Sequence, residues 1–334
     1  MSSGTALAVE TAGLVKTFGE TRAVDGVDLS VAAGTVYGVL GPNGAGKTTT
    51  IRMLATLLRP DAGTALVFGR DVVREAPAVR RLIGLTGQVA SVDETLSAAE
   101  NLVIFARLLG LNRASARRRA AELLDEFGLA DAAKRPVAKF SGGMRRRLDL
   151  AASLIATPPL IFLDEPTTGL DPRTRAQMWQ TIRRLAGAGS TVLLTTQYLD
   201  EADQLADRVA VIDRGRVVAE GTPDELKASA GASTLQLRLA DPGQAPHTRE
   251  AIMAVLAVDA IPSPEGGRIT APMDEPDRVA DLLVALRDRG IRLAELSVHK
   301  PTLDQVFLAI TGHETQPQDD REEEEEEEEE EAVA

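Results

Sequence analysis

Cysteine is absent from this chain of 334 residues, which excludes disulfide bonds and metal sites built on thiolates. Aromatic residues make up only 3% of the chain, so a surface that stacks nucleic-acid bases is not expected. No apolar run approaches the roughly 18 residues that a membrane-spanning helix needs, and the longest candidate, 151–163, contains Pro158 and Pro159. The N-terminal residues lack the pattern of a secretory signal. A role at a membrane would therefore require a separate chain to supply the spanning part.

The net charge of −13 resides almost wholly at the C-terminus. From Asp319 onward, two Asp, ten Glu and one Arg contribute −11, which leaves −2 for the other 318 residues. The folded part is thus nearly neutral, and no nucleic-acid partner is expected. Two arginine clusters, Arg117–Arg119 and Arg145–Arg147, are predicted to be solvated helix faces, with nucleic-acid or lipid binding as the alternative. Residues 314–334 are predicted to be a disordered poly-Glu tail, because like charges repel.

Hydrophobic patterning divides the rest of the chain into two predicted domains. Residues 1–229 alternate short apolar runs with helical patterns, which is typical of an α/β domain with a parallel sheet and helices on both faces. From about 88 to 159 the pattern is helical and predicts an inserted subdomain, where Ser97 and Glu100 have capping-box spacing. Residues 230–313 predict a small α+β domain of β-α-β-α-β type. The predicted buried strands are Val36–Leu40, Leu160–Leu163, Val192–Leu194 and Val209–Ile212, the last ending in a hairpin turn at Asp213–Arg216.

The segment after Val36–Leu40 has a sequence suited to holding phosphate. Glycines let the backbone approach an anion closely, successive amide N–H groups point at it, and the following helix adds its positive end. Lys47 is predicted to reach the β- and γ-phosphates, and the Thr48 hydroxyl to bind magnesium, Mg²⁺. The alternative is a glycine-rich turn that matches by chance, which the preceding strand and following helix disfavour. The loop matches G-x-x-x-x-G-K-[ST] and comprises Gly41, Pro42, Asn43, Gly44, Ala45, Gly46, Lys47 and Thr48, with Thr49 next.

Two carboxylates end the apolar run Leu160–Leu163. Asp164, at the strand end, suits a role at the Mg²⁺ ion. Glu165 is then placed to polarise an attacking water. A charged turn after a buried strand is the alternative, and the phosphate loop upstream argues against it. Together the two segments predict binding and hydrolysis of a nucleotide.

A third segment, Ser141-Gly142-Gly143-Met144, follows Phe140. In isolation it would be a helix N-cap with glycines. In this order, the segments resemble the nucleotide-binding domain of ABC transporters, with their LSGGQ-type signature, over roughly residues 8 to 229. The resemblance implies a P-loop NTPase-type fold in which the signature of one subunit closes over ATP held by the phosphate loop of another. Ser141, Gly142 and the Gly143 amide would form that second anion site.

Three further positions match the family residue by residue. Gln88 resembles the glutamine that touches Mg²⁺ and the attacking water and contacts the membrane partner. Phe18 resembles the aromatic residue that stacks on adenine, although an ordinary core position is the alternative. The segment Gly169-Leu170-Asp171 resembles the one that crosses between subunits, and Asp171 is also a predicted N-cap before Pro172.

One position departs from the family pattern. A histidine usually follows the next strand, but here the chain has Thr195-Thr196-Gln197-Tyr198, and its three histidines lie at 247, 299 and 313. Gln197 can hydrogen-bond the γ-phosphate or a water, but it cannot take up a proton near neutral pH. This variant resembles the ATP-binding subunits of daunorubicin/doxorubicin-type resistance exporters, as does the segment Lys300–Leu308.

The resemblance implies an ATPase that uses ATP and Mg²⁺, works as a dimer of two copies and drives a separate transmembrane permease. It implies a position at the cytoplasmic face of the membrane and export of a drug or antibiotic. A soluble regulatory ABC ATPase is the alternative, although such proteins usually carry two cassettes and this chain has one phosphate loop. A phosphate-loop kinase or GTPase is disfavoured by the signature and by the lack of a guanine-reading N-K-x-D.

Overall fold

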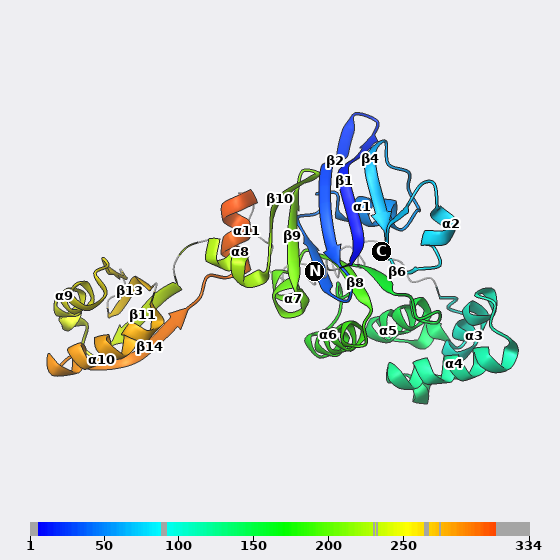
Figure 1. Ribbon diagram of the computed structural model, residues 1–334. Coiled ribbons are helices and arrows are strands. Elements are labelled where there is room, and N and C mark those ends of the chain that lie inside the picture. The colour runs from blue at the N-terminus through cyan, green and yellow to red at the C-terminus, as the bar shows by residue number, and fades with distance from the viewer. Residues whose placement is uncertain are drawn as a thin grey trace, which may run out of the picture. The chain divides into compact units, whose positions relative to one another are not determined.

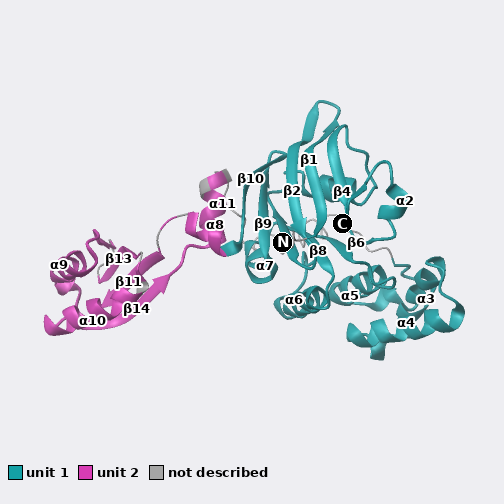
Figure 2. Cartoon of the chain, in the orientation of Figure 1, with its two compact units in different colours: residues 1–223, 313–334 teal, residues 224–312 magenta. Residues whose placement is uncertain are grey.

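The computed structural model describes residues 6–87, 92–229, 231, 233–263, 267–273 and 275–311. These residues form two compact units, one up to Pro223 and the other from Asp224 onward (Figure 2). The division thus falls inside helix α8 (Pro223–Ser229), whereas the sequence places the end of the first domain after residue 229. Both Gln88 and the predicted acidic tail 314–334 lie outside the described residues.

A six-stranded sheet forms the centre of the first unit (Figure 1). Its strand order is β10-β9-β3-β8-β7-β6, and every neighbouring pair is parallel except β9 and β10, which form the predicted hairpin at Asp213–Arg216. Strands β3, β7 and β8 are buried along their whole length, as continuous apolar runs predict. The strands are β3 (Val36–Leu40), β6 (Ile83–Thr86), β7 (Leu160–Asp164), β8 (Thr191–Thr196), β9 (Arg208–Asp213) and β10 (Arg216–Gly221).

Different secondary-structure elements pack on the two faces of this sheet. Along β7, Ile161 and Leu163 pack toward the helices, whereas Leu160 and Phe162 pack against helix α1 (Lys47–Leu54) and a second, antiparallel sheet. The prediction of helices on both faces was therefore wrong in part, because strands rather than helices supply most of one layer. The second sheet has the order β2-β1-β4-β5, with β1 (Leu7–Phe18), β2 (Thr21–Ala32), β4 (Ala62–Val67) and β5 (Arg70–Asp71).

The helical part of the first unit starts at the predicted capping box. The Ser97 side chain accepts from the Glu100 N–H, and the Glu100 carboxylate accepts from the Ser97 N–H. Asp171 is the predicted N-cap of α6, with Pro172 next. The helices of this unit are α1, α2 (Ala76–Val79), α3 (Ala98–Leu108), α4 (Arg113–Glu126), α5 (Gly142–Ser153), α6 (Pro172–Gly187) and α7 (Leu199–Leu205).

The second unit contains one more strand than the predicted β-α-β-α-β pattern. Between Ser233 and His299, its described strands and α-helices follow one another as β-α-β-β-α-β, and the antiparallel sheet has the order β12-β13-β11-β14. The extra strand, β12, has only two residues, which is too short for an alternating pattern to reveal. The elements are β11 (Ser233–Leu239), α9 (Ala245–Leu256), β12 (Ile261–Pro262), β13 (Arg268–Met273), α10 (Val279–Asp288), β14 (Leu293–His299) and α11 (Leu303–Thr311), besides α8.

Candidate nucleotide site

The parallel register brings three loops to one edge of the central sheet. Leu40 of β3 pairs with Thr196 of β8, and Asp164 of β7 pairs with Thr195. The carboxyl ends of these strands therefore meet, as they do in other open α/β sheets that bind ligands there. The phosphate loop, Glu165 and Gln197 all follow directly from these strand ends.

Glycines in the phosphate loop are required by close backbone packing. A Cβ at Gly41 would lie 2.2 Å from the Ile212 carbonyl oxygen, and one at Gly46 would lie 2.3 Å from that of Ala23. Gly46 also has φ of 105°, a left-handed conformation that disfavours side chains. Because the first amide groups of a helix have no partner within it, the start of α1 offers its N–H groups to an anion.

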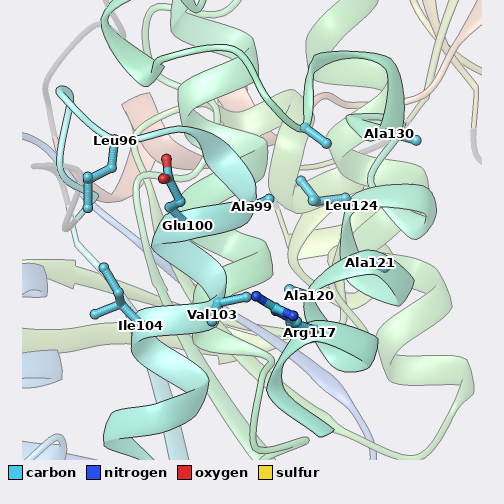
Figure 3. A pocket seen from close by; sticks show the side chains of 11 residues that line it. Leu96, Ala99, Glu100, Val103, Ile104, Arg117, Ala120, Ala121, Leu124 and Ala130 are labelled. Carbon is cyan, nitrogen blue, oxygen red and sulfur yellow. The ribbon is translucent and has the colours of Figure 1, made fainter. Parts of the chain in front are cut away.

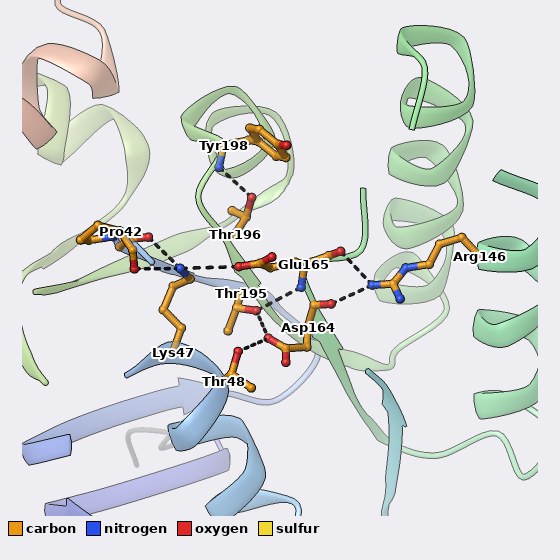
Figure 4. A network of polar contacts seen from close by, with 10 residues as sticks. Pro42, Lys47, Thr48, Arg146, Asp164, Glu165, Thr195, Thr196 and Tyr198 are labelled. Carbon is orange, nitrogen blue, oxygen red and sulfur yellow. Dashed lines mark hydrogen bonds and ion pairs between the residues drawn. The ribbon is translucent and has the colours of Figure 1, made fainter. Parts of the chain in front are cut away.

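The Lys47 ammonium lies inside this loop. Its Nζ donates to the carbonyls of Gly41 at 2.8 Å and Pro42 at 3.1 Å, and it lies 3.7 Å from a Glu165 carboxylate oxygen (Figure 4). The side chain is buried, which strengthens its electrostatic interactions. The loop thus holds one positive charge next to one carboxylate.

Phe18 lies beside the loop, at the end of β1. Its ring is 50% exposed, which excludes the core position that the sequence left open. The Lys16 ammonium sits 5.6 Å from the ring centroid and is anchored by Asp61 at 2.8 Å. The hollow has a volume of about 410 Å³, which suits a small ligand. Its lining comprises Phe18, Ala23, Asn43, Gly44, Ala45, Gly46, Lys47, Thr48, Thr49 and Glu165.

Asp164 receives two hydroxyl groups on one carboxylate oxygen. Thr48 Oγ1 donates to Asp164 Oδ1 at 3.0 Å, and Thr195 Oγ1 donates to the same atom at 2.6 Å (Figure 4). The carboxylate is buried, so these bonds set its orientation. The arrangement joins the phosphate loop to the ends of β7 and β8. Thr195 was not among the predicted site residues, because a threonine in a buried strand is common for its β propensity alone.

Glu165 has an unusual backbone conformation. Its φ of 49° lies in the left-handed region, which residues other than glycine adopt at a cost and which concentrates at functional sites. The Glu165 N–H donates to the main-chain and side-chain oxygens of Thr195, both at 3.1 Å. The surrounding structure therefore holds this residue in place, with its carboxylate directed toward Lys47 (Figure 4).

Arg146 holds the same segment from its other side. Its guanidinium donates to the carbonyls of Asp164 at 2.7 Å and Glu165 at 2.8 Å (Figure 4). It also donates to the carbonyls of Pro166 at 3.1 Å and of Gly87. Burial lowers the pKa of Arg146, and the charges of Asp149 and Asp164 oppose that change.

The prediction of a solvated face at Arg145–Arg147 was therefore wrong for Arg146, and also for Arg147, which donates to the Phe127 carbonyl at 3.2 Å. In the other cluster, Arg119 likewise donates to the Leu154 carbonyl at 2.9 Å. A fixed guanidinium fork suits several backbone oxygens at once, and the sequence does not reveal where those oxygens lie.

The signature residues start helix α5. Ser141 is its N-cap and accepts from the Met144 N–H at 3.3 Å. A Cβ at Gly143 would lie 2.5 Å from Thr174 Cγ2, so a glycine permits close packing against α6. A hollow of about 330 Å³ adjoins this helix end and is separate from the phosphate-loop hollow, although Glu165 lines both. Its lining comprises Gly142, Arg145, Arg146, Glu165, Thr168, Gly169 and Leu170.

Known proteins resemble this chain over nearly its whole length. A family model described as ABC transporter matches residues 24–168. The daunorubicin/doxorubicin resistance ATP-binding protein DrrA of Streptomyces peucetius is 58% identical over 314 residues, which cover 94% of each chain. This chain belongs to the ABC transporter ATPases.

Further relatives of this ABC ATPase are more distant. The doxorubicin resistance ATP-binding protein DrrA of Mycobacterium tuberculosis is 46% identical, over 93% of this chain and 95% of that protein. Nod factor export ATP-binding protein I of Burkholderia orbicola is 38% identical, over 90% and 96%. Among solved structures, the ADP conformation of the ATP-binding cassette MJ1267 is 27% identical with a TM-score of 0.60, over 66% of this chain and 92% of that one. A dimeric cassette in a post-hydrolysis state, bound to ADP and Pi, is 26% identical with a TM-score of 0.59, over 64% and 98%.

Two further predicted positions of this ABC ATPase, Gln197 and Asp171, lie within the described residues. Gln197 is half-buried directly after β8. Asp171 is exposed and accepts from the Thr174 N–H at 2.9 Å and hydroxyl at 2.6 Å; these bonds, the hydroxyl first, lower the pKa of Asp171. Gln88 belongs to the part of the chain that is not described, although its neighbour Gly87 contacts Arg146.

An apolar groove lies in the helical part of the ABC ATPase, away from the nucleotide site. Its volume is about 520 Å³, and Val103 and Leu124 are among the side chains directed into it from α3 and α4 (Figure 3). Ile104, Leu108 and Leu109 of the same region are 45%, 77% and 55% exposed. Within the described residues, no helix is both long enough and apolar enough to cross a membrane.

Proposed function

We propose that this ABC ATPase powers a separate transmembrane permease that exports a drug or antibiotic, from a position at the cytoplasmic face of the membrane. The observation that carries the ATPase chemistry is the meeting of Lys47, Asp164 and Glu165 at one edge of the sheet. Drug export rests on the relatives, whose names refer to daunorubicin and doxorubicin resistance. The names of more distant relatives refer to export of another compound.

Each residue of the edge has a distinct part in the proposed reaction. Lys47 and the amide groups of the phosphate loop bind the β- and γ-phosphates and hold the γ-phosphate opposite Glu165. Glu165 accepts a hydrogen bond from the attacking water and orients it in line with the γ-phosphate. Gln197 contributes a further hydrogen bond to the γ-phosphate or to that water. Phe18 stacks on the adenine, because its exposed ring adjoins the loop.

The residues present fit a magnesium ion that ATP brings with it. Thr48 Oγ1 and Asp164 Oδ1 are hard oxygen donors 3.0 Å apart, beside the phosphate loop. Among the described residues, no cluster of three or more His, Cys, Asp or Glu could hold a metal ion, so water and phosphate would supply most of the other ligands, as Mg²⁺ usually requires. Bound Mg²⁺ would neutralise charge on the phosphates. Gln88 is a further proposed ligand.

A second copy of the chain completes the proposed site. Ser141 caps a helix of twelve residues that begins at Gly142, and the N-terminus of a helix favours an anion. Gly142, however, lines a hollow distinct from that of the phosphate loop. We infer that each signature faces the ATP of the other copy, with the segment that ends at Asp171 at the contact. A solved dimeric cassette of similar fold supports this arrangement.

The apolar groove between α3 and α4 is the proposed docking surface for the permease. It exposes large apolar side chains that a monomeric soluble domain usually buries. Glu100 and Arg117 at its border would orient a partner by charge (Figure 3).

Drug accumulation provides the test of the proposed function. Cells that express the chain together with its membrane protein should retain less daunorubicin than cells that express either alone. Cells with the Glu165→Gln chain should retain as much as cells without it. Equal accumulation in all four strains, with ATPase activity intact, would exclude drug export for this class of compound.

A further inference from the structure

Glu201 on α7 is a fully buried carboxylate outside the nucleotide hollow. Its Oε1 accepts from Thr167 Oγ1 at 3.0 Å and from Trp179 Nε1 at 3.2 Å. Burial raises the pKa of Glu201, whereas the hydrogen bonds from Thr167 and Trp179 lower it. A carboxylate inside a protein requires such donors. Glu201 therefore joins the start of the segment 167–171 to α7, the helix that begins two residues after Gln197.

Arg175 on α6 makes a second connection between the same two segments. Its Nη2 donates to the Leu170 carbonyl at 3.1 Å, and its guanidinium lies 5.4 Å from the centre of the Tyr198 ring. A guanidinium at that distance is attracted to the face of the ring. The Tyr198 N–H in turn donates to Thr196 Oγ1 at 2.9 Å (Figure 4).

The two connections meet just after Gln197 in the chain. Arg175 reaches Tyr198, the residue after Gln197 and the N-cap of α7, and Glu201 joins Thr167 to the same helix. The phosphate-loop hollow is lined by none of the four side chains involved, which are those of Thr167, Arg175, Tyr198 and Glu201. Their geometry is therefore suited to setting where Gln197 lies, and unsuited to binding nucleotide directly.

We propose that Arg175 and Glu201 are positioning residues that couple the segment 167–171 to Gln197. When the second copy contacts that segment, the two connections move Tyr198 and α7 with it and bring Gln197 to the γ-phosphate. The inference rests on the proposed nucleotide-sandwich dimer. According to this inference, the partner copy controls turnover at this site through side chains that do not touch ATP.

Substitutions in the Arg175–Tyr198 pair test the coupling in the full chain. Arg175→Met removes both contacts of the guanidinium and should lower kcat about tenfold while KM for ATP changes less than about twofold. Tyr198→Leu should reproduce this loss because it removes the ring. Tyr198→Phe keeps the ring and should retain wild-type kcat, as should Arg118→Met on the exposed face of α4.

A double-mutant cycle separates positioning from a general structural effect. If Arg175 acts through Gln197, Arg175→Met in a Gln197→Ala background should change kcat by less than about twofold. The inference would be overturned if the fold-changes in kcat of Arg175→Met and Gln197→Ala multiply in the double variant. It would also be overturned if Arg175→Met and Tyr198→Leu both retain the wild-type kcat. Urea unfolding followed by Trp179, the one tryptophan of the chain, verifies that each variant is folded. Full turnover by Glu165→Gln would contradict the proposed catalysis instead.

Discussion

Replacing Arg146 by lysine should separate ATP binding from turnover. The guanidinium donates to the carbonyls of Asp164, Glu165, Pro166 and Gly87, and one ammonium group cannot occupy all of those positions. Hydrogen bonds to charged groups contribute about 1.5–3 kcal/mol each, so losing two of them should lower the free energy of unfolding by about 3–6 kcal/mol.

The effect on catalysis follows from the backbone at Glu165. Its left-handed φ of 49° persists only while its neighbours hold it, and Arg146 supplies the contact to its carbonyl oxygen. A shift of about 1 Å in a catalytic group can cost about 100-fold in rate, so Arg146→Lys should lower kcat by about 10- to 100-fold. Because Arg146 does not line the phosphate-loop hollow, the Kd for ATP should change less than about threefold.

Three measurements on purified protein check this prediction: steady-state phosphate release, equilibrium ATP binding and urea unfolding. Arg118→Lys is the matched control, because its side chain is 72% exposed and its nearest carboxylate oxygen, on Glu122, lies 3.9 Å away. That change should alter the free energy of unfolding by less than about 0.5 kcal/mol. A wild-type kcat in a destabilised Arg146→Lys protein would refute the claim that Arg146 positions Glu165. Unchanged stability would refute the hydrogen-bond argument itself.

Three further predictions concern the nucleotide site. Glu165→Gln should lower kcat on the order of 10²- to 10⁴-fold while ATP still binds, and phosphate release at the wild-type rate would exclude Glu165 as the base. Gln197→Ala should slow phosphate release less than Glu165→Gln does, and the opposite ranking would assign water activation to Gln197. Phe18→Ala should raise the Kd for ATP about tenfold, from a lost stacking contact of about 1–3 kcal/mol, whereas Phe18→Tyr should match the wild type. An unchanged Kd in equilibrium binding would remove Phe18 from the adenine site.

Much of the fold follows from local patterns in the chain. The continuous apolar runs predicted β3, β7, β8 and β9, and the structure confirms a parallel arrangement of these strands. The capping box at Ser97 and the N-cap at Asp171 were also confirmed, because they depend only on residues three positions apart. The antiparallel sheet with β1 and β2 and the two-residue strand β12 were not predicted, since the pairing of β1 with β4 joins segments far apart in the chain and β12 has too few residues to show a pattern.

The nucleotide site likewise has features that the sequence predicts and features that it does not. The chain itself determines the phosphate loop and the Asp164-Glu165 pair, because closely spaced residues of particular chemistry suffice to hold a phosphate and a metal ion. Only the tertiary structure decided which arginines serve the site. Arg145, Arg146 and Arg147 are alike in the sequence, yet Arg146 alone reaches the carbonyls of both Asp164 and Glu165. The tertiary packing determines which backbone oxygens, distant in the sequence, come within reach of a guanidinium. No local sequence pattern encodes that distance.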